Sequence, residues 1–363
     1  MHQETQEPSP EVHGAKGTSK ATPTGGTATR ISVRAGGKPS RSTPTTMFRL
    51  NTAQMYTLLA FAHASLAIPL LFFPHASSKL VFGRSADPVD KQHASLLQLY
   101  ASGLSTSTSM LLALEELARG GLLHTLTADL LKMGLIGHSI ASLTLLATYF
   151  RTICINWVVV EGLAAIATFA LPASSLLTTP TNRARIWSTL RTIPNLAMGA
   201  FLRPQQRRFS WLALMYNTLM ANVLVAGLSY IFAPRWSLYH AFGYDYGKSA
   251  HYMWSLIGSG ALLTLVPATL MALKHKADTQ RMAATPARTL NVGLMGTAIG
   301  HMLVLGPWMF KGWNAGALLP GLVGSWGGVL VTSMLGLAAP EVQHMAEEVV
   351  EAATATGRGE KME

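Results

Sequence analysis

The spacing of the charged residues constrains this chain more than any other feature of its sequence. Lys, Arg, Asp and Glu leave eight long stretches that hold at most one charge each. A helix needs about 20 residues to cross a hydrocarbon core about 30 Å thick, and the stretches reach or approach that length. Only 12% of the residues are charged, too few to cover a soluble globule built from eight such helices. We therefore predict an all-α integral membrane protein with about eight transmembrane helices. The stretches are residues 50–78, 92–114, 133–150, 152–182 (interrupted by Glu161), 209–234, 249–273, 289–310 and 312–340.

The distribution of basic residues gives an orientation. With eight crossings, 21 of the 28 Lys and Arg residues fall on the side of the amino terminus and 7 on the other side. Basic residues are enriched on the cytosolic side of membrane proteins, so both termini are predicted to be cytosolic. The net charge of +11 then reflects topology, and nucleic acid is not an expected partner.

The amino-terminal residues leave two choices of membrane. They contain no secretory signal, so the first span is predicted to be an uncleaved anchor in an endomembrane or the plasma membrane. A mitochondrial membrane is the alternative, since residues 12–86 contain no acidic side chain. Glu4, Glu7 and Glu11 do not suit a transit peptide.

An internal repeat appears when residues 52–175 are laid on residues 211–340. The offset stays near 160 residues. Four helices return the chain to its starting side, so the two copies are predicted to be parallel four-helix repeats. The matches are Pro74, Phe82 and Gly83 with Pro234, Phe242 and Gly243; Lys91 and Gly103 with Lys248 and Gly260; and Met133, Gly134, Ile136, Gly137 and His138 with Met295, Gly296, Ile299, Gly300 and His301.

Five segments follow from these patterns. The tail of residues 1–49 is rich in Ser, Thr, Gly and Pro and is predicted to be disordered. Acidic and apolar residues alternate in the last segment, which is predicted to form a short amphipathic helix and to contact a protein partner. The segments are the tail 1–49, repeat 1 at 50–178, a basic cytosolic linker at 179–208, repeat 2 at 209–340 and a cytosolic tail at 341–363.

One family resemblance can be identified in the repeat. An aromatic-Gly loop follows the first helix, and Leu96, Leu97 and Leu99 precede Gly103 at the start of a helix rich in small residues. This pattern resembles DoxX-type and related four-helix membrane families. The resemblance implies a four-helix unit, and an association with oxidoreductases or quinone is implied by the family alone. The doubled length departs from the family's single unit, and no catalytic signature carries over to numbered positions.

Ionisable residues at membrane depth are the candidates for function. They are Glu161, His138, His301 and His63, of which Glu161 is the most costly to bury. His138 or His63 is the expected partner of Glu161. In one interpretation they form a proton-linked site or a small polar cavity, with His138 and His301 related by the repeat. In the other, neutral histidines only link helices through hydrogen bonds.

No metal site or cofactor is predicted. Cys154 is the single cysteine, which excludes an internal disulfide and a thiolate zinc site. Paired histidines could ligate a haem, and a quinone could bind without ligands, so both stay as minor alternatives. No catalytic motif is present, and an enzyme is not the expected class.

Small and aromatic residues have structural interpretations. Gly296 and Gly300, like Gly324 and Gly328, repeat at four-residue spacing and are predicted to pack helices closely. Tyr239 and Tyr252 are predicted to belong to an aromatic belt at the membrane surface.

Three functions remain open at this point. The first is a transporter or channel for a small solute or protons, with a path between the halves. The second is a scaffold or assembly factor without catalysis, and the third is a redox protein that binds haem or quinone. The sequence does not specify the oligomeric state.

Overall fold

The computed structural model describes residues 51–83, 91–177, 184–194, 210–243, 247–279, 281–310 and 318–359. Every regular element in these ranges is a helix, which confirms the all-α prediction for this part of the chain. The tail 1–49 and most of the linker 179–208 lie outside the described residues. The helices are α1 (Thr52–Phe72), α2 (Pro74–Phe82), α3 (Lys91–Arg119), α4 (Leu126–Tyr149), α5 (Ile155–Leu177), helix 184–194, α7 (Trp211–Phe232), α8 (Pro234–Phe242), α9 (Gly247–Leu256), the π-helix η2 (Ile257–Leu265), α10 (Val266–Asp278), α11 (Thr285–Phe310) and α12 (Leu319–Gly359).

Seven of the helices are long and apolar enough to cross a membrane. α9, η2 and α10 form one of them, as a continuous helix over Gly247–Asp278. The eighth predicted stretch is α3, which is 29 residues long but less apolar because Ser and Thr occupy six of the eight positions from 102 to 109. Seven helices thus support a multi-pass membrane protein. The hydropathy of α3 is too low to identify it as an eighth span.

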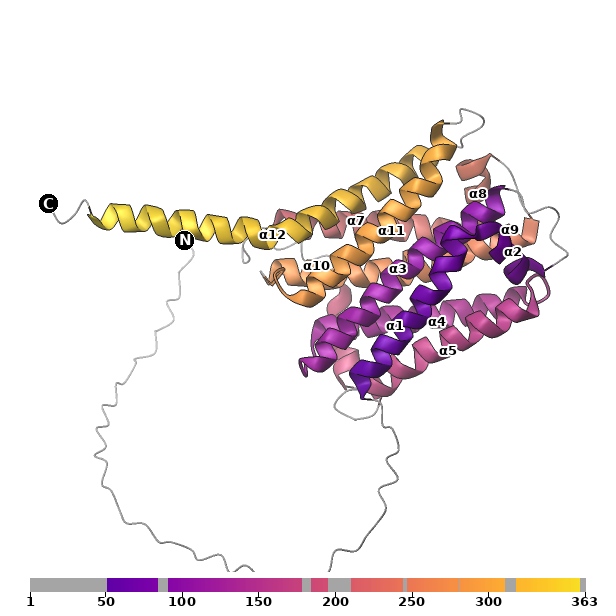
Figure 1. Cartoon of the computed structure of the whole chain (residues 1–363), viewed down its shortest axis with the longest axis horizontal. Coiled ribbons are helices and arrows are strands. Elements are labelled where there is room, and N and C mark those ends of the chain that lie inside the picture. The colour runs from indigo at the N-terminus through magenta and orange to yellow at the C-terminus, as the bar shows by residue number, and fades with distance from the viewer. Residues whose placement is uncertain are drawn as a thin grey trace, which may run out of the picture. The chain divides into compact units, whose positions relative to one another are not determined.

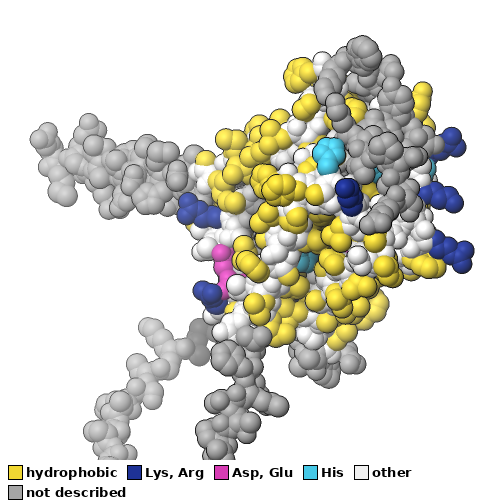
Figure 2. Space-filling model, turned by 45° about the vertical axis from the view of Figure 1, so that its right-hand side comes forward, with side chains coloured by type: hydrophobic (Ala, Val, Ile, Leu, Met, Phe, Trp, Pro, Cys, Tyr) yellow, Lys and Arg dark blue, Asp and Glu magenta, His cyan; other side chains and the backbone are white. Residues whose placement is uncertain are grey.

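The outer surface of the bundle is apolar. The side chains of Phe61, Phe232 and Phe310 are 72%, 80% and 85% exposed. Figure 2 shows hydrophobic side chains over most of the visible face of the bundle, with most Lys and Arg side chains towards its edges. A surface with this much exposed apolar area is stable in contact with lipid rather than water.

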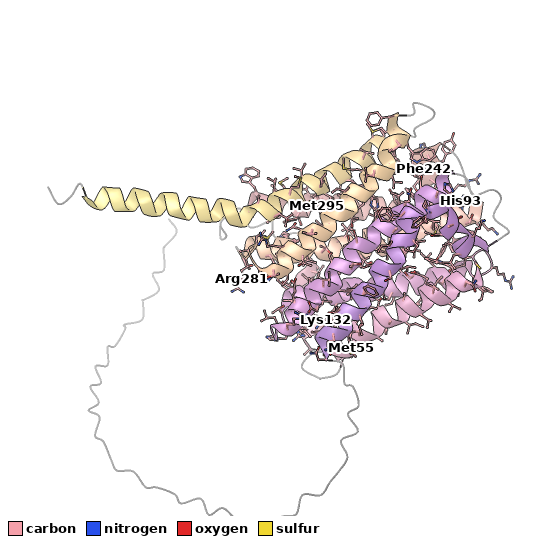
Figure 3. The ribbon with its side chains drawn as sticks, viewed as in Figure 1. Met55, His93, Lys132, Phe242, Arg281 and Met295 are labelled. Carbon is pink, nitrogen blue, oxygen red and sulfur yellow. The ribbon has the colours of Figure 1, made fainter. Side chains whose placement is uncertain are left out.

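The two ends of the bundle carry different parts of the chain. Met55 of α1, Lys132 of α4 and Arg281 lie at one end in Figure 3, whereas His93 of α3 and Phe242 of α8 lie at the other. We call the first the basal end and the second the apical end. α3 therefore runs the length of the bundle from His93 to the basal end, as the helices on either side of it do.

A short helix follows the first long helix in each half. α2 and α8 each contain nine residues and begin with a proline, Pro74 or Pro234. The residue before each proline leaves the helical conformation, with φ and ψ of −126° and 52° at Phe73 and −136° and 55° at Ala233. Proline is favoured in the first turn of a helix and disfavours a helical residue before it, which explains both breaks. The charge-free stretches 50–78 and 209–234 therefore each contain a span and the start of a second helix.

The third long helix of each half packs mainly on the other half. α3 lies between α1 and α11, whereas α4 packs on η2 and α10 as well as on α5 (Figure 1). Small residues permit these contacts. A Cβ atom at Gly300 would lie 2.5 Å from the Cβ of Ser102, and one at Gly134 would lie 2.5 Å from the Cβ of Ala268. The halves are therefore interlocked, with α11 against α3 and α4 against η2–α10.

The segment after residue 340, for which the sequence predicts a short amphipathic helix, is helical and continues the last apolar helix. α12 is one helix of 41 residues from Leu319 to Gly359, of which Leu319–Ala339 is apolar enough to span. No proline or glycine interrupts residues 341–356. The helix therefore continues well beyond its apolar segment.

Candidate functional site

Glu161 is buried in the amino-terminal half, on the second turn of α5. Its side chain is 2% exposed, and Oε1 accepts a hydrogen bond of 2.9 Å from the Tyr100 hydroxyl of α3. Ser142 of α4 lies close to the same carboxyl group. Among the described residues, no Lys, Arg or His forms an ion pair with it. The partner of Glu161 is thus a tyrosine, and the expectation of His138 or His63 in that role is wrong.

Aromatic side chains enclose this carboxyl group on the apical side. Trp157, one turn before Glu161, packs edge-on against Tyr100 with ring centroids 6.3 Å apart. Its Nε1 donates a hydrogen bond of 2.9 Å to the hydroxyl of Tyr252, which belongs to α9 in the other half. Tyr252 is fully buried, so its predicted place in a surface belt is wrong, whereas Tyr239 is 54% exposed. The second half thereby contributes to the wall around Glu161.

His63 forms a second polar group at mid-depth. Its Nδ1 lies 2.8 Å from Ser107 Oγ of α3, and its Nε2 lies 2.8 Å from Thr168 Oγ1 of α5. The two hydroxyls also lie within hydrogen-bond distance of backbone carbonyls, those of Leu104 and Ala164. A neutral imidazole needs one of these hydroxyls to donate to the ring, whereas an imidazolium ion donates to both. The two hydroxyls can therefore provide hydrogen-bond partners to the ring in either protonation state.

The polar groups repeat every seven residues along three helices. α5 carries Glu161, Thr168 and Ser175; α3 carries Tyr100 and Ser107; α1 carries Tyr56 and His63. Seven residues are about two turns, so residues at this spacing share a helix face, about 10.5 Å apart. Tyr56 is fully buried and contacts Ser175 near the basal end. We call these three levels the polar ladder: Glu161–Tyr100, His63–Ser107–Thr168 and Tyr56–Ser175.

His138 adjoins the ladder and touches the other half. It is 3% exposed and lies near enough to His63 to interact electrostatically. Its Nδ1 has no hydrogen-bond partner among the described residues. A Cβ atom at Gly260, in the π-helix η2, would lie 2.6 Å from that nitrogen, so the ring rests directly on the η2 backbone. π-Helical turns are rare and occur often at functional sites.

His301 contacts different side chains from Glu161. Its Nδ1 is 2.8 Å from Ser102 Oγ and 2.9 Å from the Thr297 carbonyl oxygen, and its ring stacks on Trp326 at 3.9 Å. His301 packs against α3 of the opposite half, as His138 packs against η2 of the opposite half. These contacts place it between α3, α11 and α12, where it links helices. Of the four ionisable candidates, only His63 and His138 interact with each other, whereas Glu161 and His301 each contact other side chains.

The carboxy-terminal half has a different interior. At the offset of 160 residues, Tyr216 answers Tyr56 and is equally buried, but Val223 answers His63. Gly324 occupies the region that answers Glu161. The Tyr216 hydroxyl donates a hydrogen bond of 2.7 Å to Asn291 Oδ1, which closes this pair. Of these three pairs of positions, Tyr56 and Tyr216 form the one that is polar in both halves.

Three of the four glycines predicted to pack helices closely face a neighbouring helix, and the fourth does not. A Cβ atom at Gly296 would lie 3.6 Å from Ser105 Oγ, and one at Gly328 would lie 3.2 Å from Leu219 Cδ2. Gly300 faces Ser102 more closely still. Gly324 has no atom within 4 Å of such a position, so it is not a close-packing residue.

No metal-binding cluster of three or more His, Cys, Asp or Glu side chains occurs in the described ranges. Cys154 is a partly exposed free thiol. No protein-family model matches this sequence, and no curated protein matches it either. Function is therefore inferred from the residues and their geometry.

Proposed function

We propose that this protein is a proton-linked membrane transporter for a small solute, with Glu161 as its proton-binding group. The observation that carries the proposal is a fully buried carboxyl group whose hydrogen bond comes from a tyrosine and not from a cation. An ionised acid at membrane depth costs about 2.5–3.5 kcal/mol, and no charge partner here offsets that cost. Glu161 therefore rests in its protonated form and releases the proton only when water or solute reaches it.

In this proposal α3 is the eighth span, and the chain comprises two parallel four-helix repeats. Three observations support it: the course of α3 from end to end, the matched breaks before Pro74 and Pro234, and the reciprocal packing of α4 and α11. Even crossings place both termini on the basal side, which the basic residues identify as cytosolic.

The polar ladder supplies the route between the apical end and the basal end. Its levels are about 10.5 Å apart, too far for direct proton transfer. Water or solute has to enter between levels, which requires the helices to separate. This spacing favours a transporter with a conformational cycle over a permanently open proton channel.

The test measures proton flux with a trapped pH-sensitive dye in vesicles that contain the full-length protein, under an imposed pH gradient. Glu161→Gln should reduce flux about a hundredfold, towards that of empty vesicles, because the amide keeps the shape but carries no exchangeable acid proton. Glu116→Gln is the matched control, because Glu116 lies near the basal end of α3 and bonds to Thr289. Equal flux in wild type and Glu161→Gln would remove Glu161 from the mechanism.

A scaffold role is the second candidate, and the length of α12 favours it. A helix that continues some 20 residues beyond its apolar segment offers a docking surface outside the membrane. Truncation after Ala339 separates the two functions. A transporter should keep its flux, whereas a scaffold should lose its copurifying partners and show no flux in either form.

A further inference from the structure

Helix 184–194 is fixed to the basal end of α4 by an ion pair between the partly exposed Arg185 and the buried Asp129. Arg185 donates from Nε to Asp129 Oδ2 at 2.7 Å and from Nη2 to Oδ1 at 3.1 Å. Asp129 is 1% exposed, and Lys132 lies 3.8 Å from the same carboxylate. Thr189, one turn after Arg185, is also buried. One face of the helix is therefore held against the bundle.

The opposite face of helix 184–194 is open. Trp187 is 67% exposed and Leu190 is 41% exposed. Arg191 is exposed, and its guanidinium group forms no ion pair among the described residues. Residues three and four apart share a helix face. The outward face, which also lines a shallow hollow, consists of Ala184, Trp187, Ser188 and Arg191.

This face lies at the level of a membrane surface. Asp129 is in the first turn of α4, and helix 184–194 lies in the sequence between the end of α5 and the start of α7. The helices α4, α5 and α7 are all apolar enough to span a membrane. Trp211, the first residue of α7, is 72% exposed. Tryptophan is enriched at the boundary between lipid tails and headgroups, so two exposed tryptophans mark that boundary.

We propose that the outward face of helix 184–194 binds the headgroup of an anionic phospholipid in the basal leaflet. The Arg191 guanidinium is placed to pair with the lipid phosphate, and the Trp187 ring to pack on the upper acyl chain. The Ser188 hydroxyl already donates to the Arg185 carbonyl, so its oxygen is left to accept a hydrogen bond from the headgroup. The proposal rests on the basal placement of this helix and not on proton transport, so it survives if flux is absent.

The test titrates the full-length protein in detergent with phosphatidylserine or phosphatidylcholine and counts bound lipids by native mass spectrometry. Arg191→Gln should lower affinity for phosphatidylserine about fivefold, the equivalent of about 1 kcal/mol for one basic residue at an anionic surface. The affinity for phosphatidylcholine should fall less, because its choline cation neutralises the phosphate charge and leaves no net negative charge for Arg191 to attract. Arg151→Gln is the matched control, because Arg151 is an exposed arginine between α4 and α5 at the apical end.

A second measurement reports on Trp187 directly. The fluorescence of the wild type minus that of Trp187→Phe isolates this residue among the 8 tryptophans. Brominated phosphatidylserine should quench the difference signal more strongly than brominated phosphatidylcholine. Equal loss of affinity in Arg191→Gln and Arg151→Gln would overturn the proposal, and so would equal quenching by the two lipids.

Discussion

In both halves of the bundle a nine-residue helix that begins with a proline follows the first long helix, but the two interiors differ. Both place a buried tyrosine near the basal end of the first helix, Tyr56 and Tyr216. Two turns further along this helix, the amino-terminal half has the buried His63 and the carboxy-terminal half has the buried Val223. The fold therefore accommodates an apolar side chain at the level that His63 occupies in the other half. Buried ionisable groups that the fold does not require, and that cost free energy, are the ones expected to serve function.

The long helix in the middle of each half differs as well. α3 is α-helical over its 29 residues, whereas its counterpart contains the π-helix η2 within 32 residues. The offset between matching residues grows from 157 at Lys91 and Lys248 to 162 at Met133 and Met295. A π-turn takes up additional residues without breaking the helix. The helix that contains η2 is three residues longer than α3, and its π-helical segment includes Gly260, on which His138 rests.

The largest loss of stability is expected at the two contacts between halves, α11 on α3 and α4 on η2–α10. It tests whether these two contacts are equivalent. Gly293→Ala on α11 places a Cβ atom against Ser109, and Gly134→Ala on α4 places one against Ala268. Each should destabilise the protein by about 3 kcal/mol, because two helices must separate. Gly306→Ala is the control on α11, since no atom lies within 4 Å of its added methyl group. Thermal unfolding in detergent measures all three, and tolerance of only one of the first two substitutions would break the equivalence.

The next effect concerns Asp129, whose counterpart at an offset of 162 is the uncharged Asn291. Arg185→Gln leaves a buried carboxylate without its main partner and should cost about 2 kcal/mol, allowing for the partial exposure of Arg185. In a protein that already carries Asp129→Asn, Arg185→Gln should leave the free energy of unfolding almost unchanged. A double-mutant cycle on unfolding in detergent gives the coupling. Additive costs would show that the ion pair does not hold the helix.

A smaller effect is expected when His63 takes the residue of the other half. His63→Val removes two hydrogen bonds, each worth about 0.6 kcal/mol between membrane helices, so the loss should be about 1 kcal/mol. Ser107 and Thr168 keep their contacts with backbone carbonyls, which limits the loss. Unfolding in detergent should show an intact fold, and proton flux should fall. A loss as large as that of Gly293→Ala would mean that the ladder is structural.

The smallest effect is expected at Tyr100. Tyr100→Phe removes the one hydrogen bond to Glu161 Oε1 and should cost about 0.6 kcal/mol. The carboxylic acid band of Glu161, identified in infrared spectra by its absence from Glu161→Gln, should shift to the frequency of a free acid. An unchanged band would show that Tyr100 is not its partner in the membrane.

Charge spacing alone predicted the seven apolar spans, with α3 as an eighth. It could do so because lipid excludes ions whatever the tertiary contacts are. The packing of α4 against η2–α10 and of α11 against α3, each in the opposite half, could not be predicted. A stripe such as Gly296 and Gly300 indicates close packing but does not identify the partner helix. The Glu161–Tyr100 pair joins residues 61 positions apart, beyond any local pattern. The spacing of Glu161, Thr168 and Ser175 was visible in the sequence and would have indicated a polar helix face.

The interlocked packing of α4 and α11 has a consequence for biosynthesis. When α4 leaves the ribosome, the helix that will cover its glycine face, η2–α10, has not yet been translated. The early helices must therefore wait in the bilayer with Gly134 and Gly137 facing lipid or a chaperone. Maturation of the first half is thus tied to completion of the second, and a chain truncated at the central linker should be a substrate for membrane quality control rather than a stable product.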